Sequence, residues 1–125
     1  MLDLRKRPSL GSDQRAVGRS SVNCTTEGGG VCVITPAGEF EGEAAQAVRE
    51  VLEAVAHSTA RKTIIDCTRI AFTDSALLHV LLDARPAHRM ILAGPLPRQL
   101  DVLLTRTGTT HLFVIADDLT AAHCL

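Results

Sequence analysis

Aromatic residues are almost absent from this chain of 125 residues, which contains three Phe and no Trp or Tyr. Proteins that bind single-stranded nucleic acid usually stack the bases on aromatic side chains, so that class of protein is not favoured. The hydrophobic content is nevertheless 46%, which is enough for the core of one domain at this length. The sequence therefore predicts one domain with a core of Val, Leu, Ile and Ala.

The chain also lacks an excess of positive charge, since its formal net charge is −1. Residues 1–21 carry five basic and two acidic side chains, whereas residues 22–125 carry eight basic and twelve acidic ones. An acidic domain does not suit nucleic acid, whose binding depends on neutralised phosphates, so we expect no nucleic-acid partner. The first residues show no apolar periodicity. We therefore predict a disordered basic tail at residues 1–20 and a folded domain at residues 21–125.

Long apolar runs are missing too, because Asp66, Arg69, Asp74 and Asp83 interrupt the most hydrophobic stretch. No segment reaches the length of a membrane span, and the basic tail lacks the apolar core of a signal peptide. We expect a cytoplasmic protein that does not insert into a membrane.

The four cysteines form no Cys-x-x-Cys pair, and no His stands at zinc-finger spacing from them. They are Cys24, Cys32, Cys67 and Cys124. The sequence predicts neither a metal site nor any other cofactor, and buried free thiols are the expected state. Cys32 and Cys67 are expected on neighbouring strands, with their thiols reduced in a cytoplasmic setting.

Hydrophobic periodicity predicts an α/β fold with a mixed sheet. Val22–Thr26 and Val31–Thr35 flank three glycines, Gly28–Gly30, which is typical of a hairpin. These glycines are not followed by the Lys and Ser/Thr of a phosphate-binding P-loop. The later predicted elements are a helix at 44–57, a strand near 64–67, a helix at 75–84, a strand at 90–93, a helix at 97–106, a strand at 112–116 and a helix at 119–124.

The most informative stretch is Thr63–Leu82, TIIDCTRIAFTDSALLHVLL, where a strand leads through a short connection at 69–73 to Asp74 and Ser75. The next residues form an apolar helix, so Ser75 stands at a helix start, where free N–H groups favour an anion such as a phosphate. Ser and Asp are also common capping residues without any function. On the residues alone, capping is the simpler interpretation.

The sequence of these elements resembles the STAS domain, found in anti-sigma factor antagonists and in sulfate transporters. The likeness rests on "FTDSALL", on "VCVITPAGE" at 31–39, on "MILAGPLPRQLDVLLTRTG" and on "LFVIADDLTAA", and it runs from about Ser21 to the C-terminus. It implies a mixed, partly parallel sheet of four to five strands packed with about four helices.

One departure from the family pattern lies at the helix start. The family usually has Asp-Ser-Ser-Gly-Leu, whereas here Asp74 and Ser75 are followed by Ala76, Leu77 and Leu78. The resemblance implies that Ser75, the first serine of that pattern, is the phosphoacceptor. The loss of the glycine bears on the local backbone, because glycine reaches conformations closed to other residues.

The resemblance implies an anti-sigma factor antagonist that is not itself an enzyme. It would bind an anti-sigma factor with a histidine-kinase-like ATPase fold and so release a sigma factor, until that kinase phosphorylates Ser75. A phosphatase would reverse the modification. The residues expected to contact the partner, besides Ser75, are Arg69, Ile70, Thr73, Asp74, Glu39 and Glu41.

Two alternatives remain open at this stage. One is a STAS scaffold subunit of a signalling or transport assembly without phosphorylation, which the missing glycine favours. The other is a small hydrolase using Asp74, Ser75 and His79, although the Gly-x-Ser-x-Gly elbow is absent. His79 is expected to pair with Asp83, one helical turn further on.

Overall fold

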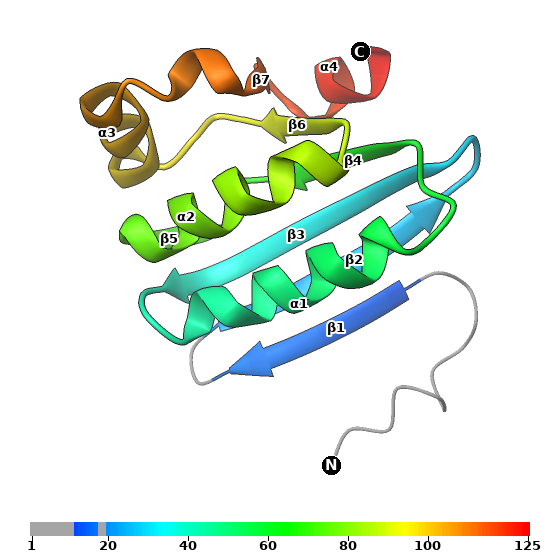
Figure 1. The fold of residues 1–125 in the computed structure, drawn as a ribbon, viewed down its shortest axis with the longest axis horizontal. Coiled ribbons are helices and arrows are strands. Elements are labelled where there is room, and N and C mark those ends of the chain that lie inside the picture. Colours follow the sequence, from blue (N-terminus) through cyan, green and yellow to red (C-terminus); the bar gives the residue numbers. More distant parts are fainter. Residues whose placement is uncertain (1–11, 18–19) are drawn as a thin grey trace.

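The computed structural model describes residues 12–17 and 20–125, and it contains one mixed sheet and four α-helices (Figure 1). The strands are β1 (Ser12–Val17), β2 (Ser20–Glu27), β3 (Val31–Phe40), β4 (Lys62–Asp66), β5 (Ile70–Thr73), β6 (Met90–Ala93) and β7 (Val114–Ala116). The helices are α1 (Ala44–Ala56), α2 (Ser75–Ala84), α3 (Arg98–Thr107) and α4 (Leu119–Cys124), with 3-10 turns at Arg85–Ala87 and Thr110–Leu112.

The sheet has the strand order β1-β2-β3-β4-β6-β7, and β5 pairs with the far end of β3. The first three strands are antiparallel, and β3, β4, β6 and β7 run parallel to one another. The prediction of an α/β fold with a partly parallel sheet is confirmed. The sheet has seven strands rather than four to five, because β1 and β5 arise where the sequence predicted a tail and a connection.

Strand β1 lies in the segment that was predicted to be a disordered tail. It pairs with β2 from Ser12 opposite Thr25 to Val17 opposite Ser20, so the expectation of disorder does not hold for residues 12–17. An edge strand is held by backbone hydrogen bonds along one side, which the side-chain pattern of a short polar segment does not reveal. Residues 1–11 and 18–19 lie outside the described residues, and for them the predicted tail stays a prediction.

The helices divide the core between the two faces of the sheet. On β3, Cys32 and Ile34 face the larger cluster with the buried residues of α1, α2 and α3, whereas Val33 faces a smaller cluster with Ala122 of α4. This alternation follows from the two-residue period of a strand. Helices α1 and α2 lie side by side across one face (Figure 1).

Most helix boundaries agree with the sequence patterns. Helix α2 begins at Ser75 as predicted, and α3 ends at Gly108, whose φ of 67° is the left-handed conformation of a helix stop. Pro97 precedes α3 as its N-cap instead of occupying the first helical position. Strand β7 is shorter than predicted, since the residues before it form the 3-10 turn. No helix in the described part of the chain is long and apolar enough to cross a membrane.

Candidate functional site

Asp74 joins the two segments that form the candidate site. Its Oδ1 accepts a hydrogen bond from the backbone N–H of Ala76 at 2.8 Å, which caps α2. Its Oδ2 accepts a second bond, at 3.3 Å, from the N–H of Gly42 in the turn between β3 and α1. One carboxylate therefore fixes the start of α2 and holds the β3–α1 turn beside it.

The residues before Asp74 form strand β5 rather than the predicted short connection. In its pairing with β3, Phe72 lies opposite Glu39 and Thr73 opposite Phe40. Thr73 is buried, and its hydroxyl lies 3.3 Å from the carbonyl oxygen of Phe40 and 3.1 Å from that of Asp74. The ladder to β3 thus sets the position at which the chain enters α2.

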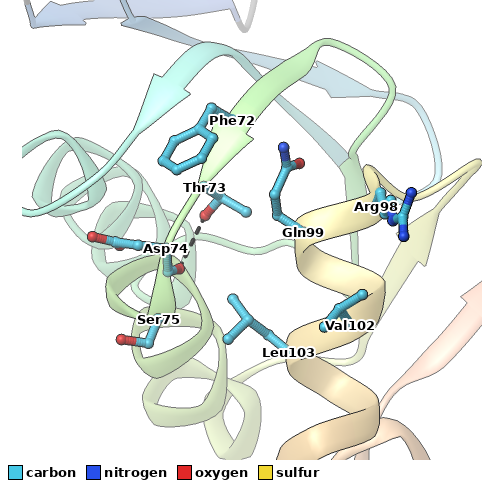
Figure 2. A pocket seen from close by; sticks show the side chains of 8 residues that line it. All are labelled: Phe72, Thr73, Asp74, Ser75, Arg98, Gln99, Val102 and Leu103. Carbon is cyan, nitrogen blue, oxygen red and sulfur yellow. Dashed lines mark hydrogen bonds between the residues drawn. The ribbon is translucent and has the colours of Figure 1, made fainter.

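Ser75 is the first residue of α2, and its side chain is exposed to solvent. Figure 2 shows its hydroxyl directed away from α3, on the outer side of the helix start. The adjacent cap bond belongs to Asp74 and leaves the serine hydroxyl unused. This oxygen is therefore open to solvent without local unfolding.

A groove of about 400 Å³ lies beside Ser75, between the start of α2 and helix α3 (Figure 2). Its lining is mainly apolar and includes Phe72 and Val102, which are 38% and 37% exposed. The other lining residues are Thr73, Asp74, Ser75, Arg98, Gln99 and Leu103. Exposed apolar side chains gathered at one place on the surface are typical of a protein-binding site.

Sequence reasoning missed the wall of this groove that α3 provides. Arg98 and Val102 are one helical turn apart, as are Gln99 and Leu103, so all four side chains point to one side. The spacing was visible in the sequence. However, this side of α3 is partly open because of the distance between α3 and β5, and that distance cannot be predicted from a sequence pattern.

The predicted contact residues separate into two groups in the structure. Glu39 lies on β3 beside Phe72, and exposed Glu41 directly precedes Gly42, so both backbone positions are close to the start of α2. Ile70 is only 5% exposed and belongs to the core. Arg69 precedes β5 at the end remote from Ser75. Its side chain instead borders a polar hollow on the sheet together with Asn23, Thr35 and Asp66.

The position where the family has glycine is occupied without backbone strain. Leu77 lies inside α2, and no non-glycine residue in the described part of the chain has a positive φ. Its side chain is 1% exposed and packs in the larger core cluster. The departure from the family pattern therefore adds a buried apolar side chain and leaves Ser75 on a regular helix start.

The hydrolase alternative gains no support from the geometry. His79 is exposed on α2, and Asp83, its predicted partner, instead pairs with Arg49 of α1 at 3.0 Å. The prediction of a His79–Asp83 pair is therefore wrong, because α1 brings a guanidinium closer. Within residues 20–125, no side-chain hydrogen bond joins Ser75 to His79. The described residues also contain no group of three or more metal-ligating side chains.

Solved structures of other proteins share this fold. An anti-sigma factor antagonist from Mycobacterium paratuberculosis is 20% identical, with a TM-score of 0.71 over 84% of this chain and 92% of its own. A proposed anti-sigma factor antagonist from Thermotoga maritima is 16% identical, with a TM-score of 0.70 over 80% and 89%. SpoIIAA from Bacillus, solved in its phosphorylated form, is 18% identical, with a TM-score of 0.60 over 91% and 98%.

Sequence comparison identifies the family of this chain but no individual relative. No curated protein sequence matches this chain. The model of the STAS domain family matches residues 25–122, which extend from β2 to α4 and include the whole candidate site. The chain thus belongs to the STAS domain family.

Proposed function

We propose that this protein is an anti-sigma factor antagonist whose binding is controlled by phosphorylation of Ser75. The observation that carries the proposal is an exposed Ser75 at a capped helix start: the residue borders the apolar groove, and its hydroxyl points outward to solvent. Its structural neighbours include anti-sigma factor antagonists, which supports the general class. The partner is an anti-sigma factor with a histidine-kinase-like ATPase fold, which would work with this protein in the cytoplasm.

The switch follows from the charge that phosphorylation adds. A phosphoserine carries roughly −1.5 to −2 charges at neutral pH. At Ser75 this charge would stand next to the Asp74 carboxylate and at the edge of the groove lined by Phe72 and Val102. A partner that buries this surface would have to desolvate the added charge as well as the Asp74 carboxylate, so phosphorylation weakens its binding.

The unphosphorylated state is prepared for binding without refolding. Asp74, Thr73 and Phe40 already hold the start of α2 through the hydrogen bonds described above. Little conformational entropy is lost when a preformed surface binds its partner. The change on phosphorylation is therefore local, and a phosphatase that removes the group would restore the same surface.

The test is affinity capture from lysate of the source cell with four baits: the native chain, Ser75→Ala, Ser75→Asp and Thr120→Asp. Thr120 is exposed on α4, which packs against the other face of the sheet. The control therefore adds the same charge away from the groove. We expect a kinase-fold anti-sigma factor on the native, Ser75→Ala and Thr120→Asp baits and its loss from Ser75→Asp.

Incubation of the recovered kinase with ATP and each bait gives the second readout. Mass spectrometry should find one phosphate on the native chain and none on Ser75→Ala. Equal capture by all baits with no phosphate on Ser75 would contradict the switch and favour an unswitched scaffold. That alternative rests on Ala76 and Leu77, which replace the family's Ser-Gly. Failure of every bait to capture such a kinase would contradict the proposed partner.

A further inference from the structure

Two cysteines that are eight residues apart in sequence meet on adjacent strands. The Sγ atoms of Cys24 on β2 and Cys32 on β3 lie 3.2 Å apart. In the antiparallel register, Cys24 faces Ile34 and Cys32 faces Thr26, so the thiols are diagonal neighbours on one face of the sheet. Cys67 directly follows β4, the parallel neighbour of β3, close to the predicted placement of Cys32 and Cys67 on neighbouring strands.

We propose that Cys24 and Cys32 form a redox-reactive pair that hydrogen peroxide converts into an intramolecular disulfide across the β2–β3 hairpin. A disulfide bond is about 2.05 Å long, so the sulfurs need to approach by only about 1.1 Å from their present separation. Because the two residues are diagonal rather than directly opposite, side-chain rotation has to be joined by a small shift of the paired strands.

The turn at Gly28–Gly30 is anchored at Gly30, whose carbonyl oxygen accepts backbone hydrogen bonds from the N–H groups of Arg61 and Lys62. Gly29 and Gly30 both have φ of 79°, a conformation that favours glycine. The bridge would close a loop over residues 25–31, which contains the whole turn. At the other end of β3, the ladder to β5 and the site around Ser75 are far from this bond (Figure 1).

Cys32 has the properties of the attacking thiol. A hydrogen bond from Cys24 is the main cause that lowers the pKa of Cys32 to about 7; the bond with Thr26 acts in the same sense, while burial and the charge of Glu27 oppose it. The thiolate is the nucleophilic form, so this thiol is reactive near neutral pH. The neighbouring Cys24 thiol can then react with the oxidised sulfur of Cys32 to form the disulfide.

The size of the reactant follows from burial. Cys32 is 3% exposed and Cys24 is 7% exposed, so a small uncharged oxidant can reach the sulfurs whereas a bulky disulfide reagent cannot. Disulfides in reducing compartments are usually transient and redox-sensing. Peroxide followed by reduction with a small thiol fits that behaviour.

The chemistry balances in two steps. The Cys32 thiolate attacks one oxygen of hydrogen peroxide, the O–O bond breaks, and the departing hydroxide takes a proton to become water. Cys32 is now a sulfenic acid. The Cys24 sulfur then attacks the Cys32 sulfur and the S–O bond breaks. The departing hydroxide leaves with the Cys24 proton as a second water. Two electrons pass from the sulfurs to one peroxide.

The other two cysteines serve as internal controls. Burial is the main cause that raises the pKa of Cys67 to about 12, and its thiol donates to the carbonyl oxygen of Ile65. Cys124 is exposed near the end of α4. A reaction that followed exposure alone would select Cys124, whereas the proposed reaction selects the two buried thiols of the hairpin.

The experiment treats the full chain with hydrogen peroxide at neutral pH, unfolds it in acid and counts free thiols by alkylation and mass spectrometry. We expect the count to fall from four to two, with a mass loss of about 2 Da that dithiothreitol reverses. Trypsin leaves both cysteines in the peptide 20–49, and cleavage after Glu27 separates them only when no disulfide is present.

Single variants locate the reaction. Cys67→Ser should form the bond like the native chain. Cys24→Ser should instead accumulate a Cys32 sulfenic acid that dimedone traps when the protein is unfolded in its presence, and Cys32→Ser should form no intramolecular disulfide. Native protein that keeps both hairpin thiols after treatment, whether or not Cys124 has joined two chains, would overturn the proposal. A disulfide from Cys32 to Cys67 would overturn it as well.

Discussion

The N–H of Gly42 donates a hydrogen bond to Oδ2 of Asp74 across 32 positions of sequence, while Oδ1 of the same carboxylate caps α2. A capping side chain ordinarily serves only its own helix. Here it also fixes the turn that follows β3, so the geometry around Ser75 depends on two distant segments held by one side chain.

Replacement of Asp74 by Ala should lower the free energy of unfolding by about 1–2 kcal/mol, since a helix cap and a turn contact are both lost. Urea denaturation measures the change. Asp118→Ala is the matched control, because Asp118 caps α4 through a single bond to the N–H of Ala121 at 2.7 Å. It should cost about 1 kcal/mol and leave phosphorylation of Ser75 unaltered. A smaller loss at Asp74 than at Asp118 would contradict the double role.

Restoration of the family glycine at position 77 should be destabilising. Leu77 is 1% exposed in the main core cluster, so Leu77→Ala should cost roughly 2–5 kcal/mol. Leu77→Gly should cost about 1 kcal/mol more, because glycine disfavours a helix interior. Ala76→Ser, which restores the other family residue, serves as the control and should change stability by less than about 1 kcal/mol. A stable Leu77→Gly protein would show that the leucine is not required for packing.

The groove should contribute to partner binding if the proposed function is correct. Phe72→Ser removes an exposed apolar side chain from the groove and should weaken capture of the anti-sigma factor at least about tenfold. Val114→Ser removes an even more exposed apolar side chain, 51% against 38% for Phe72, from β7, outside the groove lining. It should leave the affinity nearly unchanged. Isothermal calorimetry with the Ser75→Ala background separates this effect from phosphorylation, and equal losses in the two variants would argue against the groove.

His123 should make stability depend on pH. Its Nδ1 lies 2.9 Å from the carbonyl oxygen of Leu119 and its Nε2 lies 2.7 Å from Oε1 of Glu27. Both ring nitrogens thus face acceptors, which only the doubly protonated ring can satisfy. The hydrogen bond to Leu119 contributes most, and the one to Glu27 next, to raising the pKa of His123 above its ordinary value.

The sign of the effect follows from that shift. Because the folded pKa is higher than the unfolded one, the stabilisation is complete below the ordinary histidine pKa of about 6.5 and is lost as pH rises through the folded value. The melting-temperature difference between native protein and His123→Gln should therefore be larger at pH 5.5 than at pH 8.5. Glu27→Gln should remove part of that pH dependence, and a difference that grows toward high pH would refute the assignment.

Local sequence patterns determined much of this fold. The hairpin around Gly28–Gly30, the exact start of α2 at Ser75 and the helix stop at Gly108 were all predicted correctly. Turn glycines, capping aspartates and apolar spacing act over a few residues, so their effect can be recognised in sequence. For Asp74 and Ser75 these patterns indicated a helix cap, and it was the resemblance to the STAS domain that pointed to Ser75 as the centre of the candidate site.

Only the tertiary structure decided which distant residues meet. Phe72 and Val102 form one groove, Arg49 displaces His79 as the partner of Asp83, and Cys24 lies against Cys32. Residues 12–17 and 70–73 join the sheet although their own sequences do not mark them as strands. Strand pairing and the spacing of packed helices depend on the register of segments far apart in the chain, and that register is set when the whole core is assembled.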